Sequence, residues 1–294
     1  MSRKTKLAIA AILALAGIIL TAHYLLQANI AVLEPAGSIG RQERDLIYLA
    51  AGLSLIVVIP VYFMLFFFAW KYREGNKQAR YDPDFDHNRL IESIWWGVPL
   101  AIITILAVAA WTSAHDLDPY KPLAAEDKTL NIQVVAMEWR WLFIYPKQNI
   151  ATFNLVQLPV NTPVRFDVTA DAPMNSFWIP QLGGQIYAMS GMTTKVHLIA
   201  DRVGSYQGYS ANISGKGFAD MSFTANSVSR ADFDKWVGYV HRYRENLDFN
   251  SYQQLSSPTV DTGISYYSGI SPDLFHQVVD KYNHSTRAYQ GGSI

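Results

Sequence analysis

The run LIYLAAGLSLIVVIPVYFMLFFFAW, residues 46–70, decides the fold class, because its 25 residues include no charged side chain. At 1.5 Å per residue, a helix of this length spans roughly 38 Å, more than the ~30 Å hydrocarbon core of a bilayer. A second uncharged run, residues 93–114, is also long enough to cross. A buried helix of a soluble protein normally has a polar face, which neither run shows. The sequence therefore predicts a hairpin of two transmembrane helices over residues 46–114.

The composition agrees with a membrane protein and excludes several kinds of site. Of the 294 residues, 50% are hydrophobic and 16% are charged, against about 25% charged in a typical soluble domain. The formal net charge is zero, so no overall field favours nucleic acid, and we expect no nucleic-acid partner. The chain contains no cysteine, which excludes disulfides, iron–sulfur clusters and thiolate-bound copper.

Basic side chains indicate how the hairpin is oriented. Those between the two runs are Lys71, Arg73, Lys77, Arg80 and Arg89, and those on the outer flanks are Arg41, Arg44, Lys121 and Lys128. The positive-inside rule therefore places the connecting loop in the cytoplasm. We expect the chain in a bacterial inner membrane, with everything after about residue 115 in the periplasm.

The N-terminal segment, residues 1–28, has the layout of a secretory signal. A basic start precedes an apolar run over residues 7–20. The apolar character resumes at residues 24–26, so an uncleaved third helix remains an alternative. We favour removal near Ala28, which leaves residues 29–45 as an outer segment.

Within the expected outer domain, residues 115–228, the sequence changes to the period of β-strands from about Lys128 onward. Around residues 164–169, apolar and polar side chains alternate as in a half-buried strand. Short pieces of this kind, separated by turn residues, predict a sandwich or a Greek-key barrel. The tail, residues 229–294, predicts a helical extension, because Ser229 and Asp232 form a start like a capping box.

Three local sequences resemble subunit II of haem–copper respiratory oxidases. They are IESIWWGVP at residues 91–99, VAMEWRW at residues 135–141 and MNSFWIPQLG at residues 174–183. The resemblance covers about residues 29–284. It implies a membrane α-helical hairpin that carries an all-β cupredoxin-like Greek-key barrel with a C-terminal helical extension. The second stretch resembles the aromatic strand that opens the family's outer domain, so we expect Trp139, Trp141 and Phe143 to share one strand face.

The resemblance also locates a copper site that has lost its ligands. In the copper-binding members, a His on the third stretch and a loop of pattern Cys-x-Glu-x-Cys-x-x-x-His-x-x-Met hold two copper ions. Here the loop reads SANISGKGFADM, residues 210–221. The corresponding positions are Asn175 for the first His, Ser210 and Ser214 for the two Cys, Asn212 for the Glu, Phe218 for the second His, and Met221, which is retained.

These replacements predict a chain without metal or other cofactor, because soft thiolates select copper in such sites. We expect the Ser and Asn side chains to form local hydrogen bonds and Met221 to lie in the core. We expect His197, which no copper pattern uses, to be a surface strand residue.

An outer domain without copper resembles the ubiquinol oxidases of cytochrome bo type. This implies a complex that oxidises ubiquinol, reduces O2 to water and moves protons outward. Haems and copper would lie in subunit I, and ubiquinol would react there. This chain would be a structural subunit, not catalytic alone, with subunit I, smaller membrane subunits and lipids as partners.

Three further points stay open at this stage. The family carries a lipidated Cys after its signal, and this place is Ala28 here, which puts lipid anchoring in doubt. One alternative function is a copper-free cupredoxin-like membrane protein with a structural or sensory role. Another is a copper-binding or copper-delivering protein, against which the missing ligands argue.

Glu92 is the candidate for proton chemistry. It precedes the second uncharged run, at the predicted cytoplasmic mouth. One interpretation is an interfacial charge beside Arg89. The resemblance instead implies the entrance of a proton-uptake channel shared with subunit I, and ionisable groups at this depth are functional by default.

Overall fold

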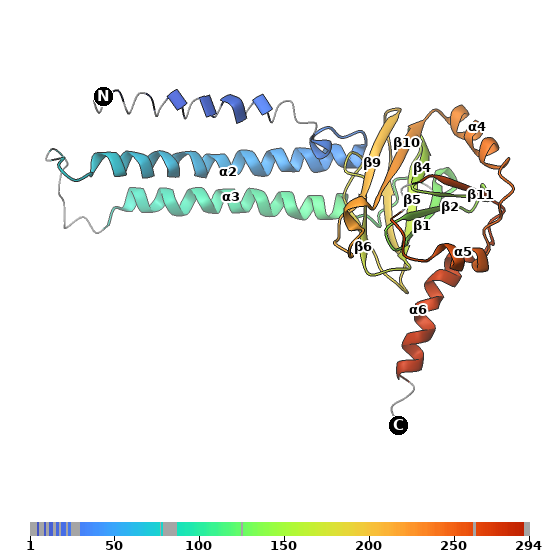
Figure 1. Cartoon of the computed structure of the whole chain (residues 1–294). Coiled ribbons are helices and arrows are strands. Elements are labelled where there is room, and N and C mark those ends of the chain that lie inside the picture. The colour runs from blue at the N-terminus through green and yellow to red at the C-terminus, as the bar shows by residue number, and fades with distance from the viewer. Residues whose placement is uncertain are drawn as a thin grey trace.

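Two long helices extend side by side from one end of a β-domain (Figure 1). The computed structural model describes residues 30–76, 78, 87–124, 126–260 and 263–290, with single residues between 5 and 24. Helices α2 (Ser38–Lys71) and α3 (Arg89–Asp116) contain the two predicted runs, and both are long and apolar enough to cross a membrane. Gly40 is the one buried residue of α2, and the described part of α3 has none. The sides of the hairpin are therefore open to lipid or to another subunit.

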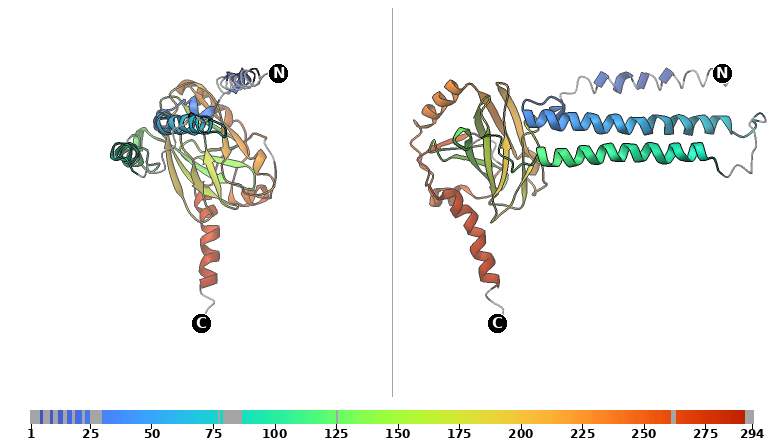
Figure 2. Two further views of the ribbon diagram at one scale, coloured as in Figure 1. Left: turned by 90° about the vertical axis from the view of Figure 1, so that its left-hand side faces the viewer. Right: turned by 180° about the vertical axis from the view of Figure 1, so that it is seen from behind.

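The β-domain consists of two sheets packed face to face (Figure 2). The first has the order β11-β3-β2-β1-β5-β8, with β1 (Leu130–Ala136), β2 (Trp141–Tyr145), β3 (Ile150–Phe153), β5 (Val164–Ala170), β8 (Thr194–Leu198) and β11 (Ser265–Ser268). The second has the order β4-β10-β9-β6-β7, with β4 (Leu155–Pro159), β6 (Asn175–Trp178), β7 (Ile186–Ala188), β9 (Gly204–Ser210) and β10 (Ser222–Val228). The pairs β1–β5 and β4–β10 are parallel, and the other pairs are antiparallel. The predicted all-β domain is confirmed.

An aromatic core lies between the two sheets. Trp141 and Phe143 point into it from β2, and Phe177 and Phe223 point into it from the facing sheet. The Phe177 and Phe223 rings stack with centroids 5.3 Å apart, and Trp141 meets both of them edge-on. Each such buried ring contributes roughly 1.5–3 kcal/mol through burial, so this cluster fixes how the two sheets face each other.

A second core covers the outer face of the first sheet. There, α5 (Phe249–Leu255) and α6 (Leu274–Gln290) place Tyr252, Leu274 and Val278 against side chains of β1 and β2. Helix α4 (Arg230–Val240) instead packs against the first core, and its N-cap Ser229 accepts from the Asp232 amide at 3.1 Å, as the sequence predicted. The extension also contributes β11, which pairs with β3.

The start of α2 is bonded directly to the β-domain. The Ala36 amide donates to Gln181 O at 2.7 Å, and the Asp201 amide donates to Ala36 O at 2.8 Å. Gly37 follows so closely that a Cβ there would lie 2.2 Å from Ile199 O. The Gly40 amide, one turn further on, donates to a second carbonyl of the β-domain at 3.0 Å. These bonds fix the direction of α2 relative to the sheets.

The chain that leaves α3 is tied to the same domain through His197. This residue was predicted at the surface, but it is buried on β8, so the prediction was wrong. Its Nδ1 lies 2.9 Å from Pro119 O, and a carbonyl only accepts, so Nδ1 carries the hydrogen. The alternating pattern of β8 assigned His197 to the polar face correctly but could not show that residue 119 covers it.

Candidate functional site

The residues at the former copper positions gather where β6 begins and β9 ends. Asn175 is the first residue of β6, and Ser210 is the last of β9. Their side chains are buried and meet directly, because Ser210 Oγ donates to Asn175 Oδ1 at 2.9 Å. Asn212 joins them through its carbonyl, 3.3 Å from Ser210 Oγ. The structure therefore brings together the predicted positions 175, 210 and 212.

The remaining polar atoms of this group bond to the backbone. Asn175 Nδ2 donates to Pro173 O at 2.7 Å, and Asn212 Nδ2 donates to Met174 O at 2.9 Å. The second bond holds the β9–β10 loop against the β5–β6 loop, and the first stays within the β5–β6 segment. The prediction of local hydrogen bonds is confirmed for Asn175, Ser210 and Asn212.

Three other positions lie in the second half of the loop. The Ser214 hydroxyl is buried, and no hydrogen-bond partner is found for it in the described part of the chain. Phe218 opens a 3-10 turn, η3 (Phe218–Asp220), and is half-buried. Met221 is buried in the aromatic core, as predicted, while its carbonyl accepts from the Ser210 amide at 3.1 Å.

This set of side chains does not suit a copper pair. Hydroxyls and amides are neutral, hard donors, whereas a dinuclear copper site of this kind depends on bridging thiolates. Ser210 and both amide side chains are also engaged in hydrogen bonds that a metal would have to break. Within the described residues, no group of three or more His, Cys, Asp or Glu side chains could hold a metal ion.

Trp139 covers the loop and corrects one prediction. It lies in the turn between β1 and β2, with φ of 72°, and so does not share a strand face with Trp141 and Phe143. Its ring packs on the loop glycines so tightly that a Cβ at Gly217 would lie 2.4 Å from Trp139 Cδ2. A non-glycine residue rarely adopts positive φ, and this backbone conformation turns the indole onto the loop instead of into the sheet.

Glu92 lies in the first turn of α3, at the end of the hairpin farthest from the β-domain (Figure 1). Asn88 is the N-cap, and its side chain accepts from the amides of Leu90 and Ile91. The backbone amide of Asn88 in turn donates to Glu92 Oε1 at 3.2 Å. The carboxylate is half-buried in this chain and takes part in a reciprocal cap. Of the loop that precedes it, Lys77 and Arg80 lie outside the described residues, as does Ala28 at the predicted signal cleavage.

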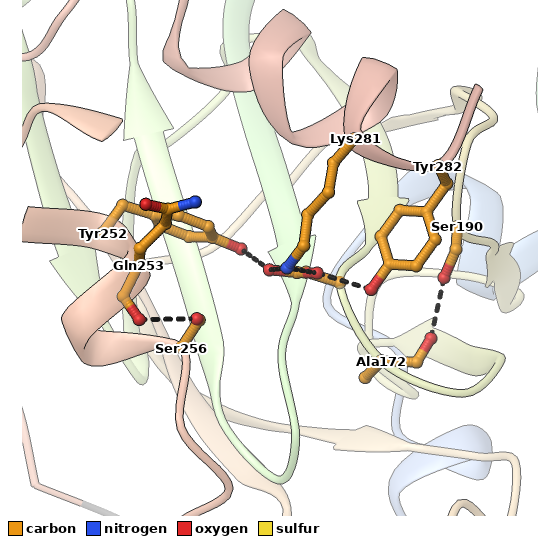
Figure 3. Close-up of polar contacts among 8 residues, drawn as sticks. Ala172, Ser190, Tyr252, Gln253, Ser256, Lys281 and Tyr282 are labelled. Carbon is orange, nitrogen blue, oxygen red and sulfur yellow. Dashed lines mark hydrogen bonds and ion pairs between the residues drawn. The ribbon is translucent and has the colours of Figure 1, made fainter. Parts of the chain in front are cut away.

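A buried carboxylate, Asp171, joins the β-domain to the C-terminal helices. Its Oδ1 accepts from Lys281 Nζ at 2.7 Å and from the Tyr282 hydroxyl at 2.6 Å, and its Oδ2 accepts from the Tyr252 hydroxyl at 2.8 Å. Figure 3 shows the polar ends of Tyr252, Lys281 and Tyr282 converging from α5 and α6. The Asp171 side chain is only 1% exposed. It lies four residues before Asn175 in the chain.

The surroundings of Asp171 keep it charged. Burial by itself would raise the pKa of its carboxyl. The hydrogen bonds from Lys281, Tyr282 and Tyr252, together with the positive charge of Lys281, outweigh burial and hold this pKa below its usual range. Burial, and then the contact with Asp171, raise the pKa of both Tyr252 and Tyr282. No local pattern in the sequence signals this contact, because Lys281 stands 110 residues after Asp171 in the chain.

Comparison with known proteins matches two parts of the chain to sequence families. Residues 142–228 match the family described as "Cytochrome C oxidase subunit II, periplasmic domain", and residues 243–285 match the "COX Aromatic Rich Motif". The "Cytochrome bo(3) ubiquinol oxidase subunit 2" of Pseudomonas putida is 51% identical over 88% of this chain and 82% of its own length. The protein of the same name from Pseudomonas aeruginosa is 48% identical over 87% of this chain and 77% of its own length. The "Ubiquinol oxidase subunit 2" of Acetobacter aceti is 47% identical over 86% of this chain and 82% of its own length.

The chain belongs to the ubiquinol oxidase subunit II family. The Asp171 contacts join the two matched regions of the chain. Asp171 lies in the matched periplasmic domain, and Tyr252, Lys281 and Tyr282 lie in the matched aromatic-rich motif. In this ubiquinol oxidase subunit II, one buried ionic cluster therefore fastens the motif to the domain. The resemblance stated from the sequence, including its oxidase function class, is confirmed.

Proposed function

We propose that this chain is a copper-free structural subunit of a membrane-bound complex that oxidises ubiquinol and reduces O2 to water. Electrons pass from ubiquinol to haems and copper in subunit I, without a relay in the β-domain. The chain supports subunit I from the periplasmic side and spans the inner membrane through α2 and α3. Smaller membrane subunits complete the assembly.

The hydrogen-bonded cluster at Asn175, Ser210 and Asn212 carries this proposal. The Ser210 hydroxyl bonds to the Asn175 side chain and to the Asn212 carbonyl, and the Asn212 side chain bonds to the Met174 carbonyl. A soluble donor such as cytochrome c delivers electrons from outside and needs an acceptor near the outer surface. A quinol arrives through the lipid, so an oxidase that uses it does not require one.

The experiment compares electron donors on the complex purified through a tag on this chain. Oxygen consumption should be rapid with a short-chain ubiquinol and should stay at background with reduced cytochrome c. Elemental analysis should give only the copper that belongs to subunit I, and this amount should remain after Ser210→Ala. Efficient oxidation of cytochrome c, or copper lost with Ser210→Ala, would contradict the proposal.

We further propose that Glu92 stands at the entrance of a proton path into subunit I. The orientation inferred from the basic loop places the first turn of α3 at the cytoplasmic surface. Its carboxylate is held at the helix end by Asn88, and the neighbouring side chains Leu90 and Ile91 are exposed. A carboxylate fixed at the water boundary can collect protons and pass them to polar groups of a neighbouring subunit.

A further inference from the structure

A cavity of about 700 Å³ opens where α2 meets the β-domain. It is lined by the turn that precedes α2, by the first two turns of α2, and by the segments around residues 181 and 202–206. Three arginines face it: Arg41, Arg44 and Arg202. Glu34 is its one lining carboxylate among the described residues. Among the lining side chains, three are therefore basic and one is acidic.

Arg41 and Arg44 are paired with carboxylates, whereas Arg202 bonds to a carbonyl. Arg41 pairs with Asp201, and Arg44 pairs with Asp45 at 2.8 Å, but the Asp45 side chain is 63% exposed and does not line the cavity. In the described part of the chain, Arg202 donates to a neutral acceptor, the Pro35 carbonyl, at 2.6 Å. A guanidinium has five N–H donors in a planar fork, so each arginine keeps donors for a further anion.

The position along α2 puts Arg41 and Arg44 at the depth of lipid phosphates. Leu46 begins the uncharged run, and Arg44 and Arg41 lie two and five residues before it, which is about 3 and 7.5 Å along the helix. The headgroup layer on each side of a bilayer is about 5–8 Å thick. With α2 crossing the membrane, both side chains stand within the outer headgroup layer.

Apolar side chains stand beside the charged ones. Leu33 and Val203 line the same cavity, and Val203 is 65% exposed although it is apolar. A site for a free ion gains nothing from such neighbours, whereas a lipid offers a phosphate together with a glycerol backbone and acyl chains. The combination is the one expected of an interfacial lipid site.

We propose that this cavity binds the phosphate of an anionic phospholipid of the outer leaflet, with Arg44 and Arg202 as its principal ligands. The bidentate geometry of guanidinium and phosphate suits this contact. The acyl chains run along the exposed apolar side of α2 below Leu46. The site is separate from the former copper loop and from Glu92, and it rests on the proposed membrane orientation only for the choice of leaflet.

The test measures lipid retained by the full chain in detergent micelles that contain phosphatidylglycerol, using native mass spectrometry. The parent chain should keep one phosphatidylglycerol under conditions that remove the others. Arg202→Gln and Arg44→Gln should each lower the retained fraction roughly tenfold, the ratio for a lost charge-assisted hydrogen bond. Arg202→Gln removes the hydrogen bond to the Pro35 carbonyl and could loosen that turn. Among the described contacts, Arg44 pairs with Asp45 and lies over the Tyr48 ring, so Arg44→Gln tests lipid binding without disturbing the turn.

Controls separate the lipid from other occupants. Lys121→Gln removes one charge at the outer end of α3, outside the cavity lining, and should leave retention unchanged. Phosphatidylcholine should be retained more weakly, and inorganic phosphate should not displace the bound lipid. Equal retention by all variants, displacement by inorganic phosphate, or loss of the arginine-dependent lipid when the chain is in the whole oxidase complex would overturn the proposal. The last outcome would mean that another subunit fills the cavity, and it would leave the donor specificity proposed above unaffected.

Discussion

The carboxylate of Glu92 accepts a hydrogen bond from the backbone amide of Asn88 and also stands at the proposed water boundary. Its structural role and its proposed proton-carrying role must therefore be tested separately. Glu92→Gln separates the two roles, because the amide oxygen of Gln can still accept that hydrogen bond but cannot titrate. We predict that turnover falls several-fold while haem content and assembly stay normal. Steady-state oxygen consumption of the purified complex is the measurement.

Two further variants serve as controls for Glu92→Gln. Glu92→Asp should retain more activity than Glu92→Gln, because it keeps a titratable group on a shorter stem. Glu74→Gln removes an exposed carboxylate from the loop between α2 and α3 and should turn over like the parent. If Glu92→Gln matches Glu74→Gln at every pH, Glu92 serves only the helix cap.

Asp171 should dominate the pH dependence of the outer domain in acid. Asp171→Asn breaks the ion pair with Lys281 and weakens the bonds to Tyr252 and Tyr282. We predict a loss of about 2–4 kcal/mol in the free energy of unfolding at pH 7, as for a buried charged hydrogen bond that loses one partner. Thermal or denaturant unfolding of the chain in detergent measures this loss.

The sign of the pH effect follows from the lowered pKa of Asp171. A carboxyl whose pKa is lower in the folded than in the unfolded state stabilises the fold above the unfolded value. This contribution is lost as the pH falls through the folded value, so the parent and Asp171→Asn should converge in strong acid. Asp280→Asn, an exposed change on the same helix, should show neither effect. A gap between parent and Asp171→Asn that stays constant down to pH 2 would contradict the assignment.

Among the elements, the start of α2 tolerates little change. Gly37→Ala would place a Cβ 2.2 Å from the carbonyl of Ile199, and that backbone belongs to the β-domain and cannot turn away. We predict that the variant moves α2 relative to the sheets and costs about 1–3 kcal/mol, as overpacking does. Lower thermal stability and weaker association with subunit I would report the change. Gly238→Ala, on the open side of α4 with nothing within 4 Å, should be as stable as the parent.

The elements also show what the sequence could and could not predict. The two membrane helices and the start of α4 were predictable, because uncharged length and a capping Ser are local signals. Strand β11 was missed, since residues 265–268 read SYYS without alternation and pair with β3 from more than 100 residues away. The Trp139 turn was missed because its positive φ leaves no trace in residue type.

The candidate site likewise has a part that could be predicted from the sequence and a part that could not. The loss of copper ligands at residues 210–218 could be predicted once the resemblance to subunit II had located the loop, because Ser and Phe cannot replace thiolate and imidazole. The partners of those residues, such as Ser210 with Asn175, depend on which strands are neighbours. Asp171 and the arginine cavity were invisible, since both combine segments that the fold, and not the chain order, brings together.

At the scale of the whole molecule, the orientation across the membrane is open to a direct test. The chain has no cysteine, so any introduced Cys is a unique label. Gln254→Cys is exposed on α5, and Glu74→Cys is exposed between α2 and α3. In spheroplasts, we predict that a membrane-impermeant maleimide labels position 254 at once and position 74 only after lysis. The reverse order would place the β-domain in the cytoplasm.

The contact between Asp171 and Lys281 also bears on how the protein is made. The ammonium that Asp171 requires is on a helix synthesised 110 residues later, so in the proposed orientation the carboxylate is exported long before its partner. Until then the apolar outer face of the first sheet, including Leu142 and Ile144, is without its cover of α5 and α6. The nascent domain must therefore pass through an aggregation-prone intermediate, which persists until helix α6 is released and packs on the sheet. We expect pulse-labelled chains to become protease-resistant only after full-length release. Chains truncated before residue 271 should stay bound to periplasmic chaperones or be degraded by periplasmic proteases.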